Sequence, residues 1–155
     1  MANNEITMGL DISCATYGFR AGSYSGFGAF RDWLARQIGD KDYDDYCSKT
    51  EEIVGDWGDK VGMSKLAHKA FLGPLMWHSD CDGYIGPKNA QVLLDNLETV
   101  KAKLKPMREL KLSRIENKEE GESPYEAEVW FRAKLEDWIT VCKDAIEHSH
   151  KIWFG

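Results

Sequence analysis

The stretch SPYEAEVWFRAKLEDWITVCKDAIEH, residues 123–148, decides the fold class because it predicts one long amphipathic helix. Ser123, Pro124 and Glu126 form a capping box with proline in the first turn, which is typical of a helix start near Pro124. Apolar side chains then recur every three or four residues: Phe131, Leu135, Trp138, Cys142 and Ala145. Such a helix must bury its apolar face, so the sequence predicts a mainly helical core.

Two further stretches have helical periodicity. Pro87 suits the first turn of a helix whose apolar residues step by four, three and four: Leu93, Leu97, Val100 and Leu104. The segment AFRDWLARQIG, residues 29–39, predicts a short amphipathic helix that Gly39 ends. Both helices should pack their apolar faces inward.

Three other segments carry weaker signals. Ser64 can cap a helix through residues 66–71, which Gly73-Pro74 interrupts. Residues 40–62 are acidic and contain several glycines, so we expect irregular surface structure with about one helical turn. Residues 105–122 are highly charged and predict a solvated turn or hairpin.

Both ends of the chain favour strands. Residues 6–13 alternate apolar and polar side chains, which predicts a half-buried strand with Asp11 and Ser13 on one face. Residues 16–28 are rich in glycine and aromatics and predict a loop that leads into a helix, and residues 151–154 predict a short closing strand. The expected fold is α+β but mainly helical: three or four helices packed on a small sheet that includes the N-terminal strand.

Length and charge limit the classes of function. A chain of 155 residues is the size of a single domain, residues 1–155. Its net charge of -6 opposes binding to nucleic acid. We find neither a leader peptide nor an apolar stretch long enough to span a membrane, and the four cysteines form no C-x-x-C pair. We therefore expect a cytoplasmic protein with reduced thiols, no membrane association and no cofactor.

The segment HSDCDGYIG, residues 78–86, concentrates side chains that can carry chemistry. Its D-C-D-G-Y-I core matches the middle of a calcium-binding EF-hand loop, but His78 and Asn89 would occupy the first and last ligand positions, where oxygen donors are needed. Zinc is an alternative, with His78 and Cys81 joined by the histidines at 148 and 150. Because both ligand sets are incomplete, we assign no metal.

Two further interpretations of this segment remain open. His78 could act as a base oriented by Asp80 or Asp82, although no nucleophile motif accompanies it. In the other, the segment is a turn in which the aspartates cap amides and Gly83 supplies a positive φ, with or without a ligand. A turn requires no imidazole, so we expect His78 to serve a ligand.

The glycine-aromatic segment before residue 31 is a second candidate site. Arg20, Tyr24 and Arg31 lie near an expected helix start, where free N–H groups and the helix dipole favour an anion. No phosphate-binding glycine motif is present, so a flexible loop whose aromatic side chains cover the core is the favoured interpretation of the segment. Asp11 and Trp77 complete the expected ligand-binding residues, because each lies beside one of these two segments.

Two motifs of this chain occur together elsewhere. MGLDIS at residues 8–13 and HSDCDG at residues 78–83 resemble a group of small uncharacterised bacterial and phage proteins that carry both. The resemblance covers residues 8–35 and 78–94, and His78, Asp80 and Asp82 are the positions that match. It implies a bacterial or phage origin but no catalytic role.

These observations favour a non-enzymatic binding protein of phage type. It would sequester a small anionic, nucleotide-like host signal or block a host defence protein, in the cytoplasm of the host cell if a phage encodes it. One alternative is a hydrolase or nucleotide-cleaving enzyme that uses His78, Asp80 and Asp82. Another is a protein interaction module, in which exposed tryptophan and tyrosine side chains contact a partner protein. A second copy of the chain is one possible partner, which would give a homo-oligomer.

Overall fold

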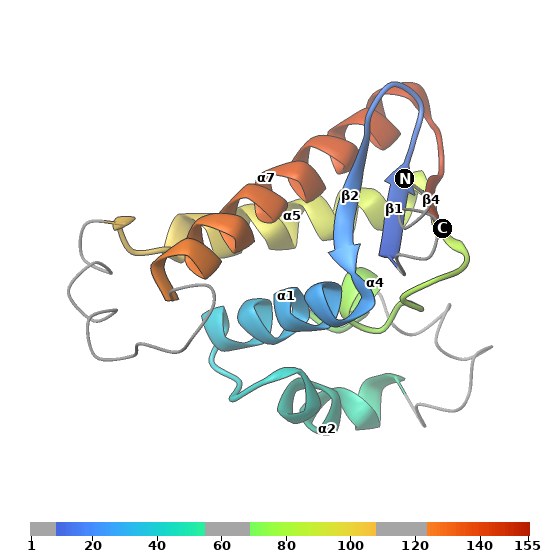
Figure 1. Cartoon of the computed structure of the whole chain (residues 1–155). Helices are drawn as coiled ribbons and strands as arrows, with labels where there is room; N and C mark the ends of the chain where they lie inside the picture. Colours follow the sequence, from blue (N-terminus) through green and yellow to red (C-terminus); the bar gives the residue numbers. More distant parts are fainter. Residues whose placement is uncertain (1–8, 55–68, 108–123) are drawn as a thin grey trace.

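The computed structural model describes residues 9–54, 69–107 and 124–155, and these residues form an α+β fold that is mainly helical (Figure 1). The predicted fold class is confirmed, with five helices and a small sheet in the described residues. The helices are α1 (Tyr24–Gln37), α2 (Tyr43–Val54), α4 (Gly73–Met76), α5 (Pro87–Lys103) and α7 (Pro124–His148). The strands are β1 (Gly9–Ser13), β2 (Gly18–Ser23), β3 (Tyr84–Ile85) and β4 (Ile152–Phe154).

The sheet is antiparallel and has the order β2-β1-β4-β3. The predicted closing strand is confirmed as β4, which lies between β1 and β3. Along β1, Leu10 and Ile12 are buried while Asp11 and Ser13 are exposed, as the alternating sequence predicts. The part of the predicted strand before Gly9 includes residues 6–8, which lie outside the described residues. Within the described residues, one face of the sheet packs on the helices, and the side chains of the other face are exposed.

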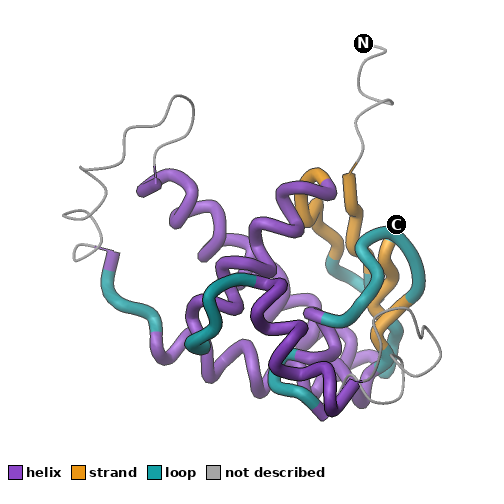
Figure 2. Tube along the Cα trace, turned by 90° about the horizontal axis from the view of Figure 1, so that it is seen from below, coloured by secondary structure: helices purple, strands orange, loops and turns teal. Residues whose placement is uncertain are grey.

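The core lies between the sheet and helices α1, α5 and α7. Leu93, Leu97 and Val100 of α5 are fully buried, so the predicted face of this helix is confirmed. On α7 the buried stripe is Leu135, Trp138, Cys142 and Ala145, with Phe131 partly buried at the α1 end. Figure 2 shows the sheet at one end of this helical body.

The prediction of a loop over residues 16–28 is wrong. Residues 18–23 form strand β2, and α1 begins at Tyr24, five residues before the predicted start. The Ser23 hydroxyl accepts a hydrogen bond from the amide of Gly26 (3.0 Å) and caps the helix. Gly22 has a φ of 119°, and a Cβ there would meet the Trp130 ring at 3.1 Å. Tertiary packing, rather than flexibility, accounts for this glycine.

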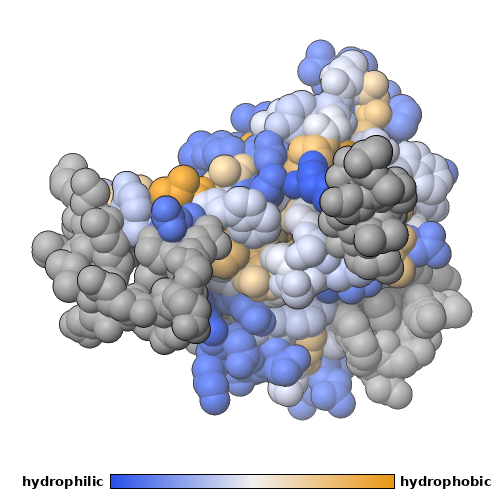
Figure 3. All heavy atoms as spheres, viewed as in Figure 1, coloured by the Kyte–Doolittle hydropathy of each residue, from blue (hydrophilic) through white to orange (hydrophobic). Residues whose placement is uncertain are grey.

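The prediction for residues 40–62 is also wrong where the structure describes them. Residues 43–54 form the three-turn helix α2, whose start is capped by Asp42 through the amide of Asp45 (2.9 Å). Tyr46 is 1% exposed and its hydroxyl donates to the carbonyl of Phe71, which fixes this polar helix to the core. In Figure 3 the surface over α2 is accordingly strongly hydrophilic. Residues 55–62 lie outside the described residues.

The weak helix signal beyond Ser64 falls partly outside the described residues, which resume at Lys69. Residues 70–72 form bends and turns, and Gly73-Pro74 begins the single-turn helix α4 instead of interrupting a helix. Proline suits this first turn because it lacks an N–H that would need a partner there. Ser123 and most of the charged segment 105–122 also lie outside the described residues. None of the helices in the described ranges could cross a membrane.

Candidate ligand-binding site

The eight residues predicted to bind a ligand do not converge on one cavity. Arg31, Trp77 and His78 meet where α1 approaches the loop before β3, whereas Asp80 and Asp82 lie exposed in that loop. Tyr24 is half-buried at the first position of α1 and packs against the core. The other two, Asp11 and Arg20, lie on the open face of the sheet.

Arg31 and Trp77 hold the structure together from buried positions. Arg31 is 4% exposed, and its guanidinium donates to the Tyr43 hydroxyl (3.0 Å) and to the carbonyl of His78 (2.6 Å). Its guanidinium also lies 4.2 Å from the centroid of the Phe27 ring. Trp77 is 1% exposed and donates from Nε1 to the Thr50 hydroxyl (2.8 Å). Arg31 joins α1 to the loop before β3, and Trp77 joins this loop to α2. Neither side chain is open to a ligand in this conformation.

His78 has a structural role that the sequence did not suggest. Its ring stacks on Phe154 of the central strand β4, with centroids 3.8 Å apart. Nε2 lies 2.9 Å from the carbonyl oxygen of Tyr84, and Nδ1 lies 3.0 Å from that of Ser79. The imidazole thus closes the loop between residues 78 and 84 and fixes it to the sheet. The expectation that His78 has no part in forming the turn is wrong.

The ring nitrogens of His78 face two acceptors, although a neutral imidazole has one N–H. Burial lowers the pKa of His78, and the nearby charge of Arg31 lowers it further, whereas the two carbonyls and Asp82 act in the opposite direction. Burial prevails. His78 is therefore neutral near pH 7 and can satisfy one of the two carbonyl groups at a time. We call this contact of His78 with Phe154 and Tyr84 the His78 anchor.

The rest of the segment confirms a turn. Gly83 has a φ of 91°, and Asp82 accepts a hydrogen bond from its amide (2.8 Å). Ser79, rather than Asp80, accepts from the amide of Cys81 (3.2 Å). Among the described residues, no group of three or more histidine, cysteine or acidic side chains is arranged to hold a metal ion. The geometry adds no support to the calcium and zinc alternatives.

The hairpin between β1 and β2 is anchored differently. Asp144 of α7 accepts hydrogen bonds from the amides of Thr16 (2.8 Å) and Tyr17 (3.1 Å) and from the Thr16 hydroxyl (2.5 Å). Burial raises the pKa of this carboxyl group, but the three donors outweigh it and lower the pKa to about 2. His148 also contacts Asp144 at 3.1 Å. We call these bonds to the hairpin the Asp144 anchor.

The cysteine thiols near these anchors are not activated. Burial raises the pKa of Cys14, which lies 3.9 Å from Nδ1 of His150, and Asp144 raises it further. Burial also raises the pKa of Cys47 and that of the fully buried Cys142. A catalytic cysteine requires a lowered pKa, so these three thiols lack the property that nucleophilic catalysis needs.

The open face of the sheet gathers aromatic and charged side chains from all four strands. Trp153 of β4 and Tyr84 of β3 are paired in register and are 43% and 47% exposed, with ring centroids 5.1 Å apart. The Lys151 ammonium lies 4.3 Å from the Tyr84 centroid and 5.6 Å from that of Trp153. We call this surface the outer sheet face; it consists of Asp11, Ser13, Gly18, Arg20, Tyr84, Lys151 and Trp153.

Small residues leave space beside these rings. Ser13 pairs with Trp153 on one side and with Gly18 on the other, so no large side chain stands on β1 or β2 in this row. A Cβ added to Gly18 would lie 3.1 Å from the carbonyl oxygen of Ile12, a tight backbone contact, but it would meet no described side chain within 4 Å. The exposed pair Arg20 and Asp11, 3.7 Å apart, forms the next row. The result is a flat area bordered by rings on one side and charges on another.

Sequence reasoning found Asp11 and Arg20 but missed the two rings. Trp153 alternates with the buried Ile152 and Phe154, a pattern that places it on the open side of a strand. Tyr84 has no such signal because β3 contains two residues. Comparison with protein-family models, with curated proteins and with solved structures finds no match to this chain. Any functional assignment therefore has to come from the chemistry of its own surface.

Proposed function

We propose that this chain is a non-enzymatic binding protein that holds a small, planar, anionic ligand of nucleotide type on the outer sheet face. The observation that carries the proposal is the exposed pair of rings, Trp153 and Tyr84, with Lys151 beside it. An aromatic ring exposed on a sheet can stack a nucleobase, and stacking of this kind contributes about 1–3 kcal/mol per base. Lys151, beside both rings, supplies positive charge for a phosphate.

Two features favour binding over catalysis. The side chains of the outer sheet face are exposed in the part of the chain that the structure describes, so they would not exclude water from a reacting group as catalytic sites do. In addition, both ring nitrogens of His78 lie beside backbone carbonyl oxygens rather than beside a carboxylate, and Asp80 and Asp82 are exposed. The resemblance to phage proteins adds the expectation that the ligand is a host signal, which this protein would sequester.

Titration with AMP, adenosine and ribose 5-phosphate tests the proposal. We expect AMP to bind most tightly, because adenosine lacks the phosphate and ribose 5-phosphate lacks the base. Trp153→Leu should weaken AMP binding about tenfold through the loss of stacking. Phe71→Leu is the matched control, since Phe71 is an exposed ring (38%) outside the sheet and its replacement should leave binding unchanged. Equal effects of the two substitutions, or no AMP binding, would refute the proposal.

Heating the complex and analysing the released ligand separates binding from cleavage. Recovery of intact AMP agrees with a binding protein, whereas recovery of adenosine or adenine would establish the hydrolase alternative. A second candidate, a protein interaction surface, is favoured by the flatness of the same face, because exposed Trp and Tyr side chains often dominate protein interfaces. In that case a partner protein, and not AMP, would protect Trp153 from solvent.

A further inference from the structure

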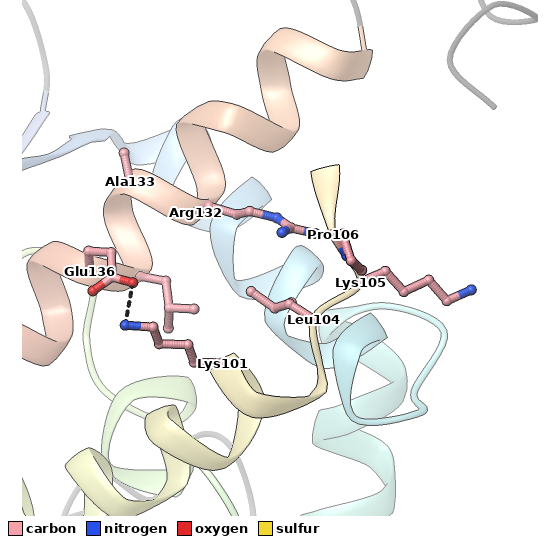
Figure 4. A pocket seen from close by; sticks show the side chains of 8 residues that line it. Lys101, Leu104, Lys105, Pro106, Arg132, Ala133 and Glu136 are labelled. Atoms are coloured by element: carbon pink, nitrogen blue, oxygen red, sulfur yellow. Dashed lines mark ion pairs between the residues drawn. The ribbon is translucent and has the colours of Figure 1, made fainter. Parts of the chain in front are cut away.

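A pocket lies away from the sheet, between the end of α5 and the middle of α7. It is open and has a volume of about 440 Å³, which is within the range of small-ligand sites. Its apolar part is formed by Leu104, Pro106, Ala133 and Leu135. Figure 4 shows Leu104 near the centre of the pocket, between α7 and the residues that follow Leu104, namely Lys105 and Pro106.

Positive charge surrounds this apolar floor in a chain whose net charge is -6. Lys101, Lys105 and Arg132 line the pocket together with one acid, Glu136. Glu136 is paired with Lys101 at 2.8 Å. Lys105 forms no ion pair with a described residue, and in Figure 4 its side chain extends outward from the pocket edge.

Arg132 is held in place before any ligand arrives. Its Nε donates to Glu128 (2.8 Å), and the other carboxylate oxygen of Glu128 accepts from Nε1 of Trp33 (2.9 Å). Arg132 and Glu128 are mostly buried, with 21% and 19% of their side chains exposed. In Figure 4 the guanidinium extends from α7 toward Pro106. Since Glu128 engages one edge of the planar group, its terminal nitrogens remain able to bind an oxyanion.

We propose that this pocket binds a small organic carboxylate with an apolar body, with the carboxylate at the terminal nitrogens of Arg132 and the body on Leu104 and Pro106. A guanidinium matches the two oxygens of a carboxylate in geometry and charge, and the floor offers the body a surface removed from water. A purely apolar ligand would form no ion pair with the basic side chains of the pocket. A small anion such as acetate would leave the apolar floor of the pocket exposed to water. The site is independent of the outer sheet face and of the function proposed for it.

Octanoate, octanol and acetate separate the contribution of the carboxylate from that of the apolar body. Octanol has the same apolar body as octanoate, and acetate has the same charge. Calorimetric titration of the full chain should show octanoate binding at least tenfold more tightly than either analogue. Arg132→Lys keeps the charge but loses the planar group, and should weaken octanoate binding about tenfold. Lys143→Gln is the control, since Lys143 lies on the same helix and also pairs with α5, through Glu98, but does not line the pocket.

A second variant tests the pocket without removing a charge. Ala133 lines the pocket and is exposed on α7, so Ala133→Leu should fill part of the space without straining the core. We expect it to abolish octanoate binding, while Ala29→Leu, at an exposed position of α1, should have no effect. AMP binding should be unchanged in both variants. Octanol binding as tightly as octanoate, or octanoate binding that survives Ala133→Leu, would overturn the proposal.

Discussion

The His78 anchor and the Asp144 anchor fix loops at different places along the sheet with opposite chemistry. Asp144 is an acceptor that meets three donors, so each of its bonds is satisfied and its charge is stabilised. His78 is neutral near pH 7 and meets two acceptors, so one carbonyl group has no proton to accept from it. The hairpin is therefore held by matched polar groups, and the loop mainly by the stacking of His78 on Phe154. This difference predicts unequal contributions to stability, with the charged form favoured at Asp144 and the neutral form at His78.

Trp138 lies in the aromatic core beside both anchors, and its replacement should have the largest effect on the free energy of unfolding. Trp138 is fully buried and contacts the rings of Phe19, Phe27 and Phe154. Trp138→Ala should therefore reduce the free energy of unfolding by about 3–5 kcal/mol, measured by urea denaturation. Val129→Ala on the same helix, where the side chain is 46% exposed, should change it little. Similar midpoints for the two variants would contradict the assigned helix face.

Removal of the hairpin anchor should have the next largest effect. Asp144→Ala leaves the amides of Thr16 and Tyr17 without their acceptor, so we expect a loss of about 2–4 kcal/mol in the free energy of unfolding. Asp137→Ala is a suitable control, because Asp137 lies on the same helix but accepts from the partly buried Tyr17 hydroxyl and from Lys134, not from the backbone amides of the hairpin. An equal loss in both variants would show that the amides need no carboxylate.

The pH dependence of Asp144 follows from its lowered pKa. The carboxylate form is favoured in the folded state, so its contribution is fully present above the ordinary value of 3.8 and is lost as the pH falls toward about 2. Asp144→Asn should remove this part of the acid sensitivity. Chemical denaturation at pH 5 and at pH 2.5 measures the difference, which should be smaller in the variant than in the parent.

Removal of the loop anchor should cost less. His78→Ala removes the stacking on Phe154 and the bond to Tyr84, and we expect a loss of about 1–2 kcal/mol. His78→Phe retains the stacking and should recover at least half of that loss. If His78→Ala were silent in folding but weakened AMP binding, the ligand role that the sequence suggested would return, and the anchor would be unimportant.

His78 should also respond to acid at a higher pH than Asp144. Because its pKa is lowered in the folded state, the neutral form is favoured there, and stability should decline as the pH falls below the ordinary value of 6.5. The free energy of unfolding between pH 7.5 and pH 5 should therefore fall in the parent more than in His78→Phe. Identical slopes for the two proteins would mean that protonation of His78 does not affect folding.

The two anchors also show what the sequence could and could not predict. The helix faces of α5 and α7 followed from periodicity, because one apolar stripe specifies one buried side. The stretch before α1 was misread because its glycines looked like loop residues, whereas Gly22 makes room for Trp130, which lies more than one hundred residues later in the chain. Likewise, neither His78 with Phe154 nor Asp144 with Thr16 has a local signature. Contacts between segments far apart in the sequence determine the roles of Gly22, His78 and Asp144. The outer sheet face also depends on such contacts.

The smallest expected effect concerns metal ions at the His78 loop. An ion stabilises a fold only in proportion to its affinity, through RT ln(1 + [L]/Kd), and this loop lacks a first oxygen donor because His78 is held by backbone carbonyls. Asp82 is already engaged by the amide of Gly83. Addition of calcium or of EDTA should therefore shift the melting temperature by less than about 2 °C. Asp80→Asn and Asp82→Asn should show the same small response as the parent, measured by differential scanning fluorimetry. A large rise with calcium that either substitution abolished would instead make this loop an ion site, with His78 displaced from Tyr84 when the ion binds.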